Sequence, residues 1–307
     1  MKLYFAPMEG ITTYYFRNAH AEMFGGCDQY FAPFLVPTEN ERISARTLRD
    51  ILPERNDIPV IPQVLCNDGK AFSEFIKKIK PLGFDTVNLN FGCPSGTVTK
   101  KYRGSGILRD LDLMDRFLYQ IFSEHEDINI SIKTRTGFYS HAEFDEILKI
   151  YQKYPISELM IHPRIREEYY NGTPNMQSFD LAYQSIKSPL CYNGNVYTTQ
   201  DFERIESRYP KLNSIMLGRG VIKNPALFRE IKGGKPLETQ ELISFSALIE
   251  KRCLELLGSE VYTLHRLKEM WLYMMQNFPE EKKILKAVKK ANRISDLNHA
   301  IGCLPAL

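Results

Sequence analysis

A single thiol, Cys93, lies between Gly92 and Pro94 in the segment NLNFGCPSGTVTKK (residues 88–101), directly after a short apolar run. Glycine allows a loop to approach a ligand closely, and proline restricts the backbone so that the neighbouring side chain keeps its direction. This placement suits a reactive thiol. The alternative interpretation is that Cys93 is a small buried hydrophobic residue.

A lysine, Lys133, ends the apolar run INISIK and is expected to point inward. Its ammonium could stabilise negative charge on a cofactor or substrate. It could instead pair with a carboxylate. A third interpretation is a Schiff base, which needs a lowered pKa, and Arg135 in KTRTGF would lower the pKa by its charge. All three interpretations stay open on the residues alone.

Two glycine-containing segments, NGNVYTTQDF (residues 193–202) and LGRGVIKNPALF (residues 217–228), each run into a predicted helix start. Glycines permit close backbone approach, and the free N–H groups of a helix start favour anions. Arg219, between two glycines, adds a forked cation suited to a phosphate monoester. The segments therefore predict a phosphate site, with an ordinary surface turn as the alternative.

The elements that must position these residues are eight short apolar runs that alternate with helical patterns up to about residue 232. Amphipathic segments such as FSEFIKKIKPLG and AEFDEILKIYQKY separate them. Eight such units over roughly 230 residues predict an α/β fold, a (β/α)8 TIM barrel. The runs are LYFAP, DQYFAP, IPVIPQV, TVNLN, INISIK, ELMIHP, PLCYN and SIMLG.

Polar, glycine or proline residues lie in or directly after seven of these runs. In a barrel the strand ends meet at one C-terminal mouth, where barrel enzymes carry their chemistry. Taken one at a time, such side chains could simply satisfy loop backbone groups. The residues are Pro7, Met8, Glu9, Gln63, Asn90, Cys93, Lys133, Arg135, His162, Arg164, Asn193, Gly194, Asn195, Gly218 and Arg219.

Composition excludes several classes of protein. The 307 residues are 43% hydrophobic and 25% charged, with no window suited to a membrane span and no secretory signal in MKLYFAPMEG, so we expect a cytoplasmic protein. Six scattered cysteines form no CxxC pair or Cys/His cluster, which predicts neither disulfides nor a metal site. The segment GSGILRD (residues 104–110) has neither the third glycine nor the preceding strand of a dinucleotide-binding fingerprint, so no Rossmann unit is predicted. A net charge of +3 does not by itself indicate nucleic-acid binding.

The segment NLNFGCPSGTVTKKYRGSG resembles the signature of the flavin-dependent tRNA-dihydrouridine synthases. Other segments resemble the same family in the same order, over about residues 1–232: APMEGIT, PQV, IKTRTGF, IHPRIREEYYNG, CYNGNV and MLGRGVIKNPALF. The resemblance implies an FMN-bound barrel that reduces uridines in folded RNA to 5,6-dihydrouridine, with NADPH as the electron donor. This chain departs from the family at Ser105, usually alanine, and at Pro163, usually glycine, which could alter substrate choice.

The resemblance also implies a role for each matching residue. Hydride would pass from reduced flavin to C6 of uracil, and Cys93 would donate the proton to C5. Asn90 and Arg135 would face the target base. The expected FMN-binding residues are Pro7, Met8, Glu9, Gln63, Lys133 and His162 around the flavin, and Asn193, Gly194, Asn195, Gly218 and Arg219 at its phosphate.

From residue 238 onward the pattern predicts helices only, so we expect a barrel domain over residues 1–237 and a small helical RNA-binding domain over residues 238–307. Lys282, Lys286, Lys290 and Arg293 form one basic stripe in EEKKILKAVKKANRI. The stripe could contact phosphates or be an ordinary solvated face. Lys100, with its basic neighbours, would add positive charge beside the mouth.

Several alternatives stay open. The same chemistry could act on ribosomal RNA, since both RNAs offer uridines in folded loops. A flavin barrel acting on a small molecule, such as a dihydroorotate or enoate oxidoreductase, would leave the basic stripe unexplained. A non-catalytic RNA-binding protein would be colourless when purified. We expect a monomer, and the uridine position and the preference for NADPH over NADH are not predicted.

Overall fold

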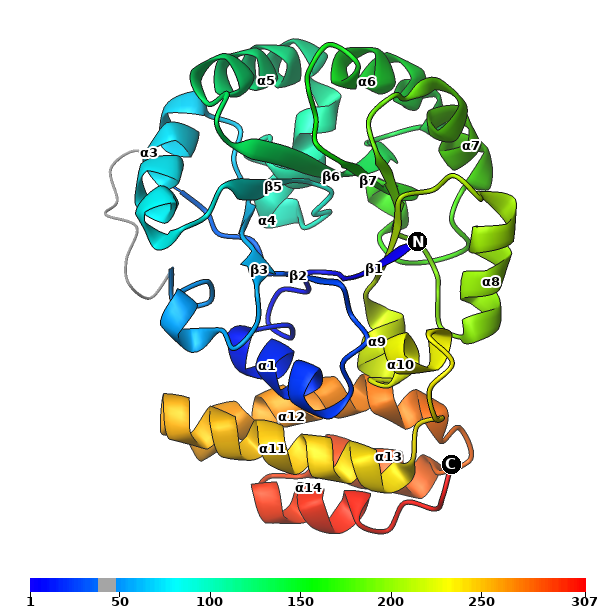
Figure 1. The fold of residues 1–307 in the computed structure, drawn as a ribbon. Helices are drawn as coiled ribbons and strands as arrows, with labels where there is room; N and C mark the ends of the chain where they lie inside the picture. Colours follow the sequence, from blue (N-terminus) through cyan, green and yellow to red (C-terminus); the bar gives the residue numbers. More distant parts are fainter. Residues whose placement is uncertain (38–47) are drawn as a thin grey trace.

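Nine parallel strands form a nearly closed ring in the computed structural model, which describes residues 1–37 and 48–307 (Figure 1). Their order around the ring is β3-β2-β1-β9-β8-β7-β6-β5-β4. This confirms the predicted TIM barrel. The strands are β1 (Lys2–Phe5), β2 (Gln29–Phe31), β3 (Val60–Ile61), β4 (Gln63–Val64), β5 (Thr86–Phe91), β6 (Asn129–Gly137), β7 (Leu159–Ile165), β8 (Leu190–Tyr192) and β9 (Ser214–Leu217).

The third predicted run is divided into β3 and β4 by Pro62. Proline has no backbone N–H to donate to a neighbouring strand, so it interrupts the ladder. Its carbonyl still accepts from Asn88 N at 2.9 Å, while β3 pairs with β2 and β4 pairs with β5. The two short strands therefore occupy one position in the ring, and the eight predicted runs are all present.

Helices surround the ring, as the amphipathic segments between the strands predicted (Figure 1). Asp68 and Asp110 cap α3 and α5 by accepting from Ala71 N and Leu113 N, which fixes where these helices begin. The helices up to residue 231 are α1 (Tyr14–Met23), α3 (Gly69–Ile79), α4 (Gly96–Thr99), α5 (Leu111–Glu124), α6 (Phe144–Tyr151), α7 (Met176–Ser185), α8 (Thr199–Arg208), α9 (Arg219–Lys223) and α10 (Leu227–Ile231).

The barrel interior is closed by its own small group of buried side chains, separate from the apolar layer between strands and helices. Because neighbouring side chains along a strand point to opposite faces, the interior group comes from alternate positions. It fills the ring below the C-terminal strand ends. The interior residues are Tyr4, Ala6, Phe31, Met160, Cys191 and Met216.

The chain after residue 238 is helical and packs against the outer side of the barrel beside α1 and α9, below the ring in the view of Figure 1. Phe245 contacts Phe16 and Phe24, with ring centroids 5.3 and 5.2 Å apart, and the buried Trp271 donates to Ser246 Oγ at 2.9 Å. One apolar core therefore continues from the barrel into these helices, and the division at residue 238 into two domains stays a prediction. The helices are α11 (Thr239–Leu257), α12 (Glu260–Met274), α13 (Lys282–Lys290) and α14 (Ile294–Ile301).

Residues 1–37 and 48–307 lack two kinds of feature. No helix there has the length and apolar character needed to cross a membrane. In the same residues, no three His, Cys, Asp or Glu side chains are grouped as metal ligands would be.

Candidate active site

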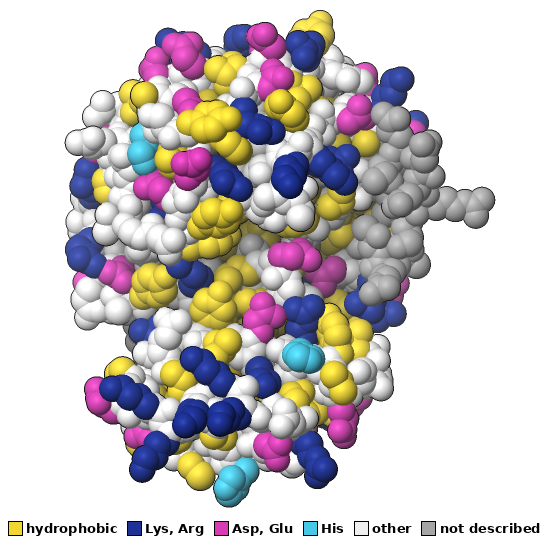
Figure 2. All heavy atoms as spheres, turned by 180° about the vertical axis from the view of Figure 1, so that it is seen from behind, with side chains coloured by type: hydrophobic (Ala, Val, Ile, Leu, Met, Phe, Trp, Pro, Cys, Tyr) yellow, Lys and Arg dark blue, Asp and Glu magenta, His cyan; other side chains and the backbone are white. Residues whose placement is uncertain are grey.

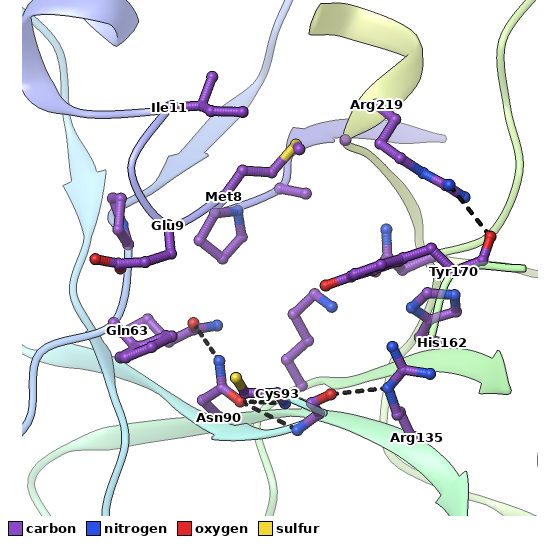
Figure 3. A pocket seen from close by; sticks show the side chains of 18 of the residues that line it. Met8, Glu9, Ile11, Gln63, Asn90, Cys93, Arg135, His162, Tyr170 and Arg219 are labelled. Carbon is purple, nitrogen blue, oxygen red and sulfur yellow. Dashed lines mark hydrogen bonds between the residues drawn. The ribbon is translucent and has the colours of Figure 1, made fainter. Parts of the chain in front are cut away.

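A cavity of about 280 Å³ opens at the C-terminal ends of the strands. Figure 3 shows Asn90 and Cys93 on one side of it and Met8 and Glu9 across from them. The barrel therefore brings most of the predicted strand-end residues to one place. Those that line the cavity are Pro7, Met8, Glu9, Gln63, Asn90, Cys93, Lys133, Arg135, His162, Asn193, Gly194, Gly218 and Arg219.

The other predicted residues, Arg164 among them, lie outside the cavity wall. Asn195 is close behind it, where its Oδ1 accepts from Arg219 Nη2 at 3.1 Å and Arg164 Nη2 at 3.2 Å, so it orients Arg219. Lys100 is exposed directly after α4. The remaining three, Lys282, Lys286 and Lys290, are exposed on α13.

The loop that carries the thiol is held by hydrogen bonds on both sides. Asn90 Oδ1 accepts from the backbone N–H groups of Gly92 and Cys93 at 3.1 and 2.9 Å. The carbonyl of Cys93 accepts from Ser105 N and Oγ at 3.0 and 2.9 Å. A Cβ on Gly104 would lie 2.7 Å from that carbonyl oxygen, so only glycine fits there. The departure at Ser105 therefore adds one hydrogen bond to the loop.

The Cys93 thiol faces the cavity and is partly buried. Burial raises its pKa above the ordinary value, and this effect outweighs the nearby positive charge of Arg135. The group is therefore a protonated thiol at neutral pH. It can donate a proton and is a poor nucleophile, because the thiolate is the nucleophilic form.

A chain of side-chain amides crosses the cavity floor between neighbouring strands. Asn90 Nδ2 donates to Gln63 Oε1 at 2.7 Å, and Gln63 Nε2 donates to Asn88 Oδ1 at 2.7 Å. Asn88 Nδ2 in turn donates to Ser131 Oγ at 2.9 Å. Each amide orients the next one, so Gln63 and Asn90 present fixed faces to the cavity.

The Lys133 ammonium has no hydrogen-bond or ion-pair partner in the part of the chain that the structure describes. Burial, together with the charge of Arg135, lowers its pKa to about 8. The carboxylate pair considered from the sequence is thus not found among these residues. At neutral pH the amine remains mostly protonated and points a positive charge at whatever fills the cavity.

Arg135 is buried and holds three loop carbonyls at once. Its Nε donates to Gly92 O at 2.8 Å, its Nη1 to Ile165 O at 2.9 Å and its Nη2 to Tyr169 O at 2.7 Å. The sequence resemblance assigned Arg135 to the target base. In the structure its guanidinium also ties the thiol loop after β5 to the loop after β7, a positioning role that the sequence did not reveal.

His162 is held as a neutral imidazole. Its Nε2 lies 2.7 Å from Arg164 Nη1, and an arginine can only donate, so Nε2 accepts and the ring proton is on Nδ1. Burial, and then the charges of Arg135 and the other nearby cations, hold the pKa of His162 well below its ordinary value. His162 can therefore donate a hydrogen bond from Nδ1 without adding charge.

The predicted phosphate site lies between the ends of β8 and β9. A Cβ on Gly194 would lie 2.0 Å from Tyr192 Oη, which leaves no room for a side chain, and one on Gly218 would make a tight contact of 3.3 Å with Ala6 Cβ. Within the described residues the N–H groups of Gly194 and Arg219 have no protein acceptor. Because α9 has only five residues, its N-terminus contributes little to anion binding, and the fixed positive charge at this site comes mainly from Arg219.

Sequence reasoning missed several cavity residues. Glu269 and Tyr273 come from α12, so the C-terminal helices form part of the wall. Their positions give no local signal, because only the docking of α12 onto the barrel brings them there. Tyr170 in EYYNG follows a strand end and could have been selected by the same rule as His162. The others are Ala6, Ile11, Pro33 and Phe34.

Comparison with known proteins places the chain in a family. A family model described as Dihydrouridine synthase (Dus) matches residues 4–301, almost the whole chain. The chain belongs to the dihydrouridine synthase family. It is therefore an oxidoreductase, as the sequence resemblance predicted.

Curated dihydrouridine synthases are similar to it along most of their length. The tRNA-dihydrouridine synthase B of Escherichia coli K12 is 29% identical over 265 residues, which cover 86% of this chain and 80% of that protein. The tRNA-dihydrouridine(16) synthase of Shigella flexneri is 26% identical over 318 residues, covering 99% and 98%.

Solved structures similar to this family member share its fold. The old yellow enzyme from Trypanosoma cruzi has a TM-score of 0.53 at 12% identity and covers 77% of this chain and 89% of its own. Morphinone reductase has a TM-score of 0.52 at 10% identity, with coverage of 76% and 86%. At such identities the likeness concerns the barrel alone.

Proposed function

We propose that this dihydrouridine synthase reduces uridines in tRNA to 5,6-dihydrouridine, with FMN in the cavity and NADPH as electron donor. The observation that carries the proposal is the protonated Cys93 thiol, fixed by Asn90 and Ser105 at the cavity edge in a chain of this family. Relatives named as tRNA-dihydrouridine synthases support tRNA over ribosomal RNA. Such a substrate would place the enzyme in the cytoplasm.

The residues present fit FMN. The bare backbone at Gly194 and Gly218, with unpartnered N–H groups and the Arg219 guanidinium, suits a phosphate monoester. The fixed amide of Gln63 and the Lys133 ammonium suit the polar edge of a flavin ring, and Pro7, Met8 and Glu9 would lie along it. When bound and reduced, FMN would supply the hydride that goes to C6 of uracil.

Cys93 would complete the reduction. Addition of hydride to C6 leaves an electron pair on C5 and O4 of uracil, and the Sγ proton of Cys93 would move to C5 to form the new C–H bond. The thiolate that remains would be reprotonated by water. Because burial raises the thiol pKa, the proton is present at neutral pH when it is needed.

The neighbouring cations would assist the addition of hydride that precedes this proton transfer. Lys133 and Arg135 place positive charge beside the cavity, where negative charge develops on the uracil. Arg135 also keeps the thiol loop in position through Gly92 O. Neutral His162 could donate from Nδ1 to a carbonyl oxygen without repelling these cations.

The exposed lysines would hold the RNA. Figure 2, seen from behind, shows Lys and Arg side chains gathered over the helical region below the central hollow. Lys282, Lys286 and Lys290 lie on α13, and Val288 on the same helix is buried in the core. Lys100 lies nearer the thiol loop. A uridine in folded RNA would have to flip out of its stack to enter the cavity.

The test is nucleoside mass spectrometry after incubating the purified protein, FMN and NADPH separately with unmodified tRNA and unmodified ribosomal RNA. We expect dihydrouridine in tRNA only, and none when NADPH is omitted. Dihydrouridine in ribosomal RNA alone would overturn the choice of substrate. Its absence from both, with protein that has bound FMN, would overturn the proposed activity.

A further inference from the structure

A second surface beside the cavity alternates aromatic and arginine side chains. Arg109 Cζ lies 4.2 Å from the ring centroid of Tyr102 and 4.9 Å from that of Phe138. Arg166 Cζ lies 5.6 Å from the ring centroid of Phe138 and 5.2 Å from that of Tyr169. Tyr102, Arg109, Phe138, Arg166 and Tyr169 thus form one continuous series, which we call the aromatic–arginine ladder.

The ladder is attached to the thiol loop. Arg109 Nη2 donates to Thr99 O at 2.8 Å, and Arg166 Nε donates to Pro94 O at 3.1 Å. The same Arg135 that holds Gly92 O also holds the carbonyl of Tyr169. The ladder therefore lies directly beside the cavity and keeps a fixed geometry relative to Cys93.

Both ends of the ladder have an unfavourable backbone conformation. Tyr102 has φ 54° and Tyr169 has φ 49°, and within residues 1–37 and 48–307 they are the two non-glycine residues with positive φ. Both tyrosines are 41% exposed, whereas Phe138 in the middle is buried. A large side chain is disfavoured at positive φ, and such strain is typically kept where a side chain is needed in one place.

A hollow opens at the Tyr102 end. It is lined by Tyr102 and Tyr139, with Arg109 and the carboxylates of Asp110 and Asp112. Tyr139 is 62% exposed, so two aromatic side chains border this hollow with part of their surface free. Asp110 Oδ1 already accepts from Leu113 N. Nearby, Lys100 and Lys101 are exposed and Arg103 is half-buried, which gives this edge an excess of positive charge that suits a phosphate backbone.

We propose that the aromatic–arginine ladder stacks unpaired nucleobases of the RNA substrate that flank the target uridine, with one base in the hollow between Tyr102 and Tyr139. This inference rests on the proposed function and adds to it a second contact with RNA. Base stacking on an aromatic ring tolerates any base, and arginines within the stack strengthen it. The ladder would hold the flanking nucleotides in place once the target base has left its stack.

The test compares Tyr102→Asn with Tyr102→Phe in binding and turnover of unmodified tRNA. Asparagine tolerates positive φ and removes the ring, whereas phenylalanine keeps the ring. We expect Tyr102→Asn to weaken tRNA binding and raise KM about 5- to 100-fold, because stacking of one base is lost. Tyr102→Phe should stay close to wild type. FMN content and kcat at saturating tRNA should not change in either variant.

Salt dependence separates stacking from phosphate contacts. Loss of a stacked base leaves the slope of log Kd against log salt unchanged, whereas loss of a lysine contact to phosphate lowers it. Tyr139→Ser, at an exposed position with ordinary φ, provides a second variant should Tyr102→Asn fail to fold. Tyr119→Asn, an exposed tyrosine on the outer helix α5, is the matched control and should bind as wild type.

The outcomes are distinct. If Tyr102→Asn or Tyr139→Ser bound tRNA as tightly as the wild type does, the ladder proposal would be overturned. The proposed function would still stand as long as the wild-type enzyme forms dihydrouridine. Equal weakening by Tyr119→Asn would also overturn it. If wild-type protein neither binds tRNA nor forms dihydrouridine, the proposed function fails first and the ladder proposal fails with it.

Discussion

Two regions of the molecule carry cations and hold them in opposite ways. One is the cavity wall formed by β5, β6 and β7, and the other is the exposed face of α13. In the cavity wall, Arg135 is buried and donates to three carbonyls. On α13, Lys282, Lys286 and Lys290 are exposed to solvent. Buried, connected groups fix geometry and protonation, whereas exposed lysines act through screened charge. Changes in the cavity should therefore alter kcat, and changes on α13 should alter RNA affinity.

The largest expected effect is that of Cys93→Ala on turnover. Removal of the proton donor should lower kcat by about 10²- to 10⁴-fold while FMN content and tRNA affinity stay near wild type. Single-turnover formation of dihydrouridine, measured by mass spectrometry, checks this. Cys27→Ala is the control, since Cys27 lies away from the cavity. A rate within twofold of wild type would remove Cys93 from the chemistry.

Arg135→Met should produce the next largest effect. It leaves Gly92 O, Ile165 O and Tyr169 O without their donors, so we expect the free energy of unfolding to fall by about 2–4 kcal/mol and kcat to fall with it. Urea unfolding and steady-state turnover measure the two changes. If stability fell and kcat did not, Arg135 would not be what positions the thiol loop.

A triple Lys→Glu change at Lys282, Lys286 and Lys290 should weaken tRNA binding about tenfold or more at low salt and flatten the salt dependence, with FMN content unchanged. Binding titrations at several salt concentrations measure it. The control introduces the same charge change at Lys70, Lys77 and Lys80, in and directly after α3, away from the C-terminal helices (Figure 1). Equal losses in both variants would show that only net charge matters.

The pH dependence of kcat should report Lys133. Its ammonium has a pKa of about 8, so the charge is present below that pH and is lost as pH rises through it. The thiol of Cys93 has a raised pKa and stays protonated in this window. We expect kcat to fall about tenfold between pH 7 and 9, and Lys133→Arg to shift this fall to higher pH. An unshifted profile in Lys133→Arg would assign the titration to another group.

Ser105→Ala should have the smallest effect. It removes one hydrogen bond to the Cys93 carbonyl and leaves the bond from the Ser105 backbone N–H, so the free energy of unfolding should drop by about 0.5–1.5 kcal/mol. Thermal unfolding and kcat measure it. Ser123→Ala, on the outer helix α5, serves as control. A large loss of kcat in Ser105→Ala would give the hydroxyl a role beyond holding the loop.

The strand ends could be predicted because parallel strands in a barrel bring them to one mouth, which is how Gln63, Lys133 and Arg219 were found together. The contacts of Arg135 could not be predicted, because its partners are backbone carbonyls, which every residue has and no sequence pattern marks. Glu269 and Tyr273 were missed because the periodicity of α12 indicates which face is buried but not what that face covers. The assigned roles of the cavity residues stay predictions.

The measurement that tests the central claim most directly is the reduction of unmodified tRNA in D₂O with NADPH, followed by location of deuterium in the isolated dihydrouridine. The Cys93 thiol exchanges with solvent, so the account predicts one non-exchangeable deuterium at C5, formed about a hundredfold or more slowly in Cys93→Ala. An unlabelled C5, or full activity of Cys93→Ala, would contradict it.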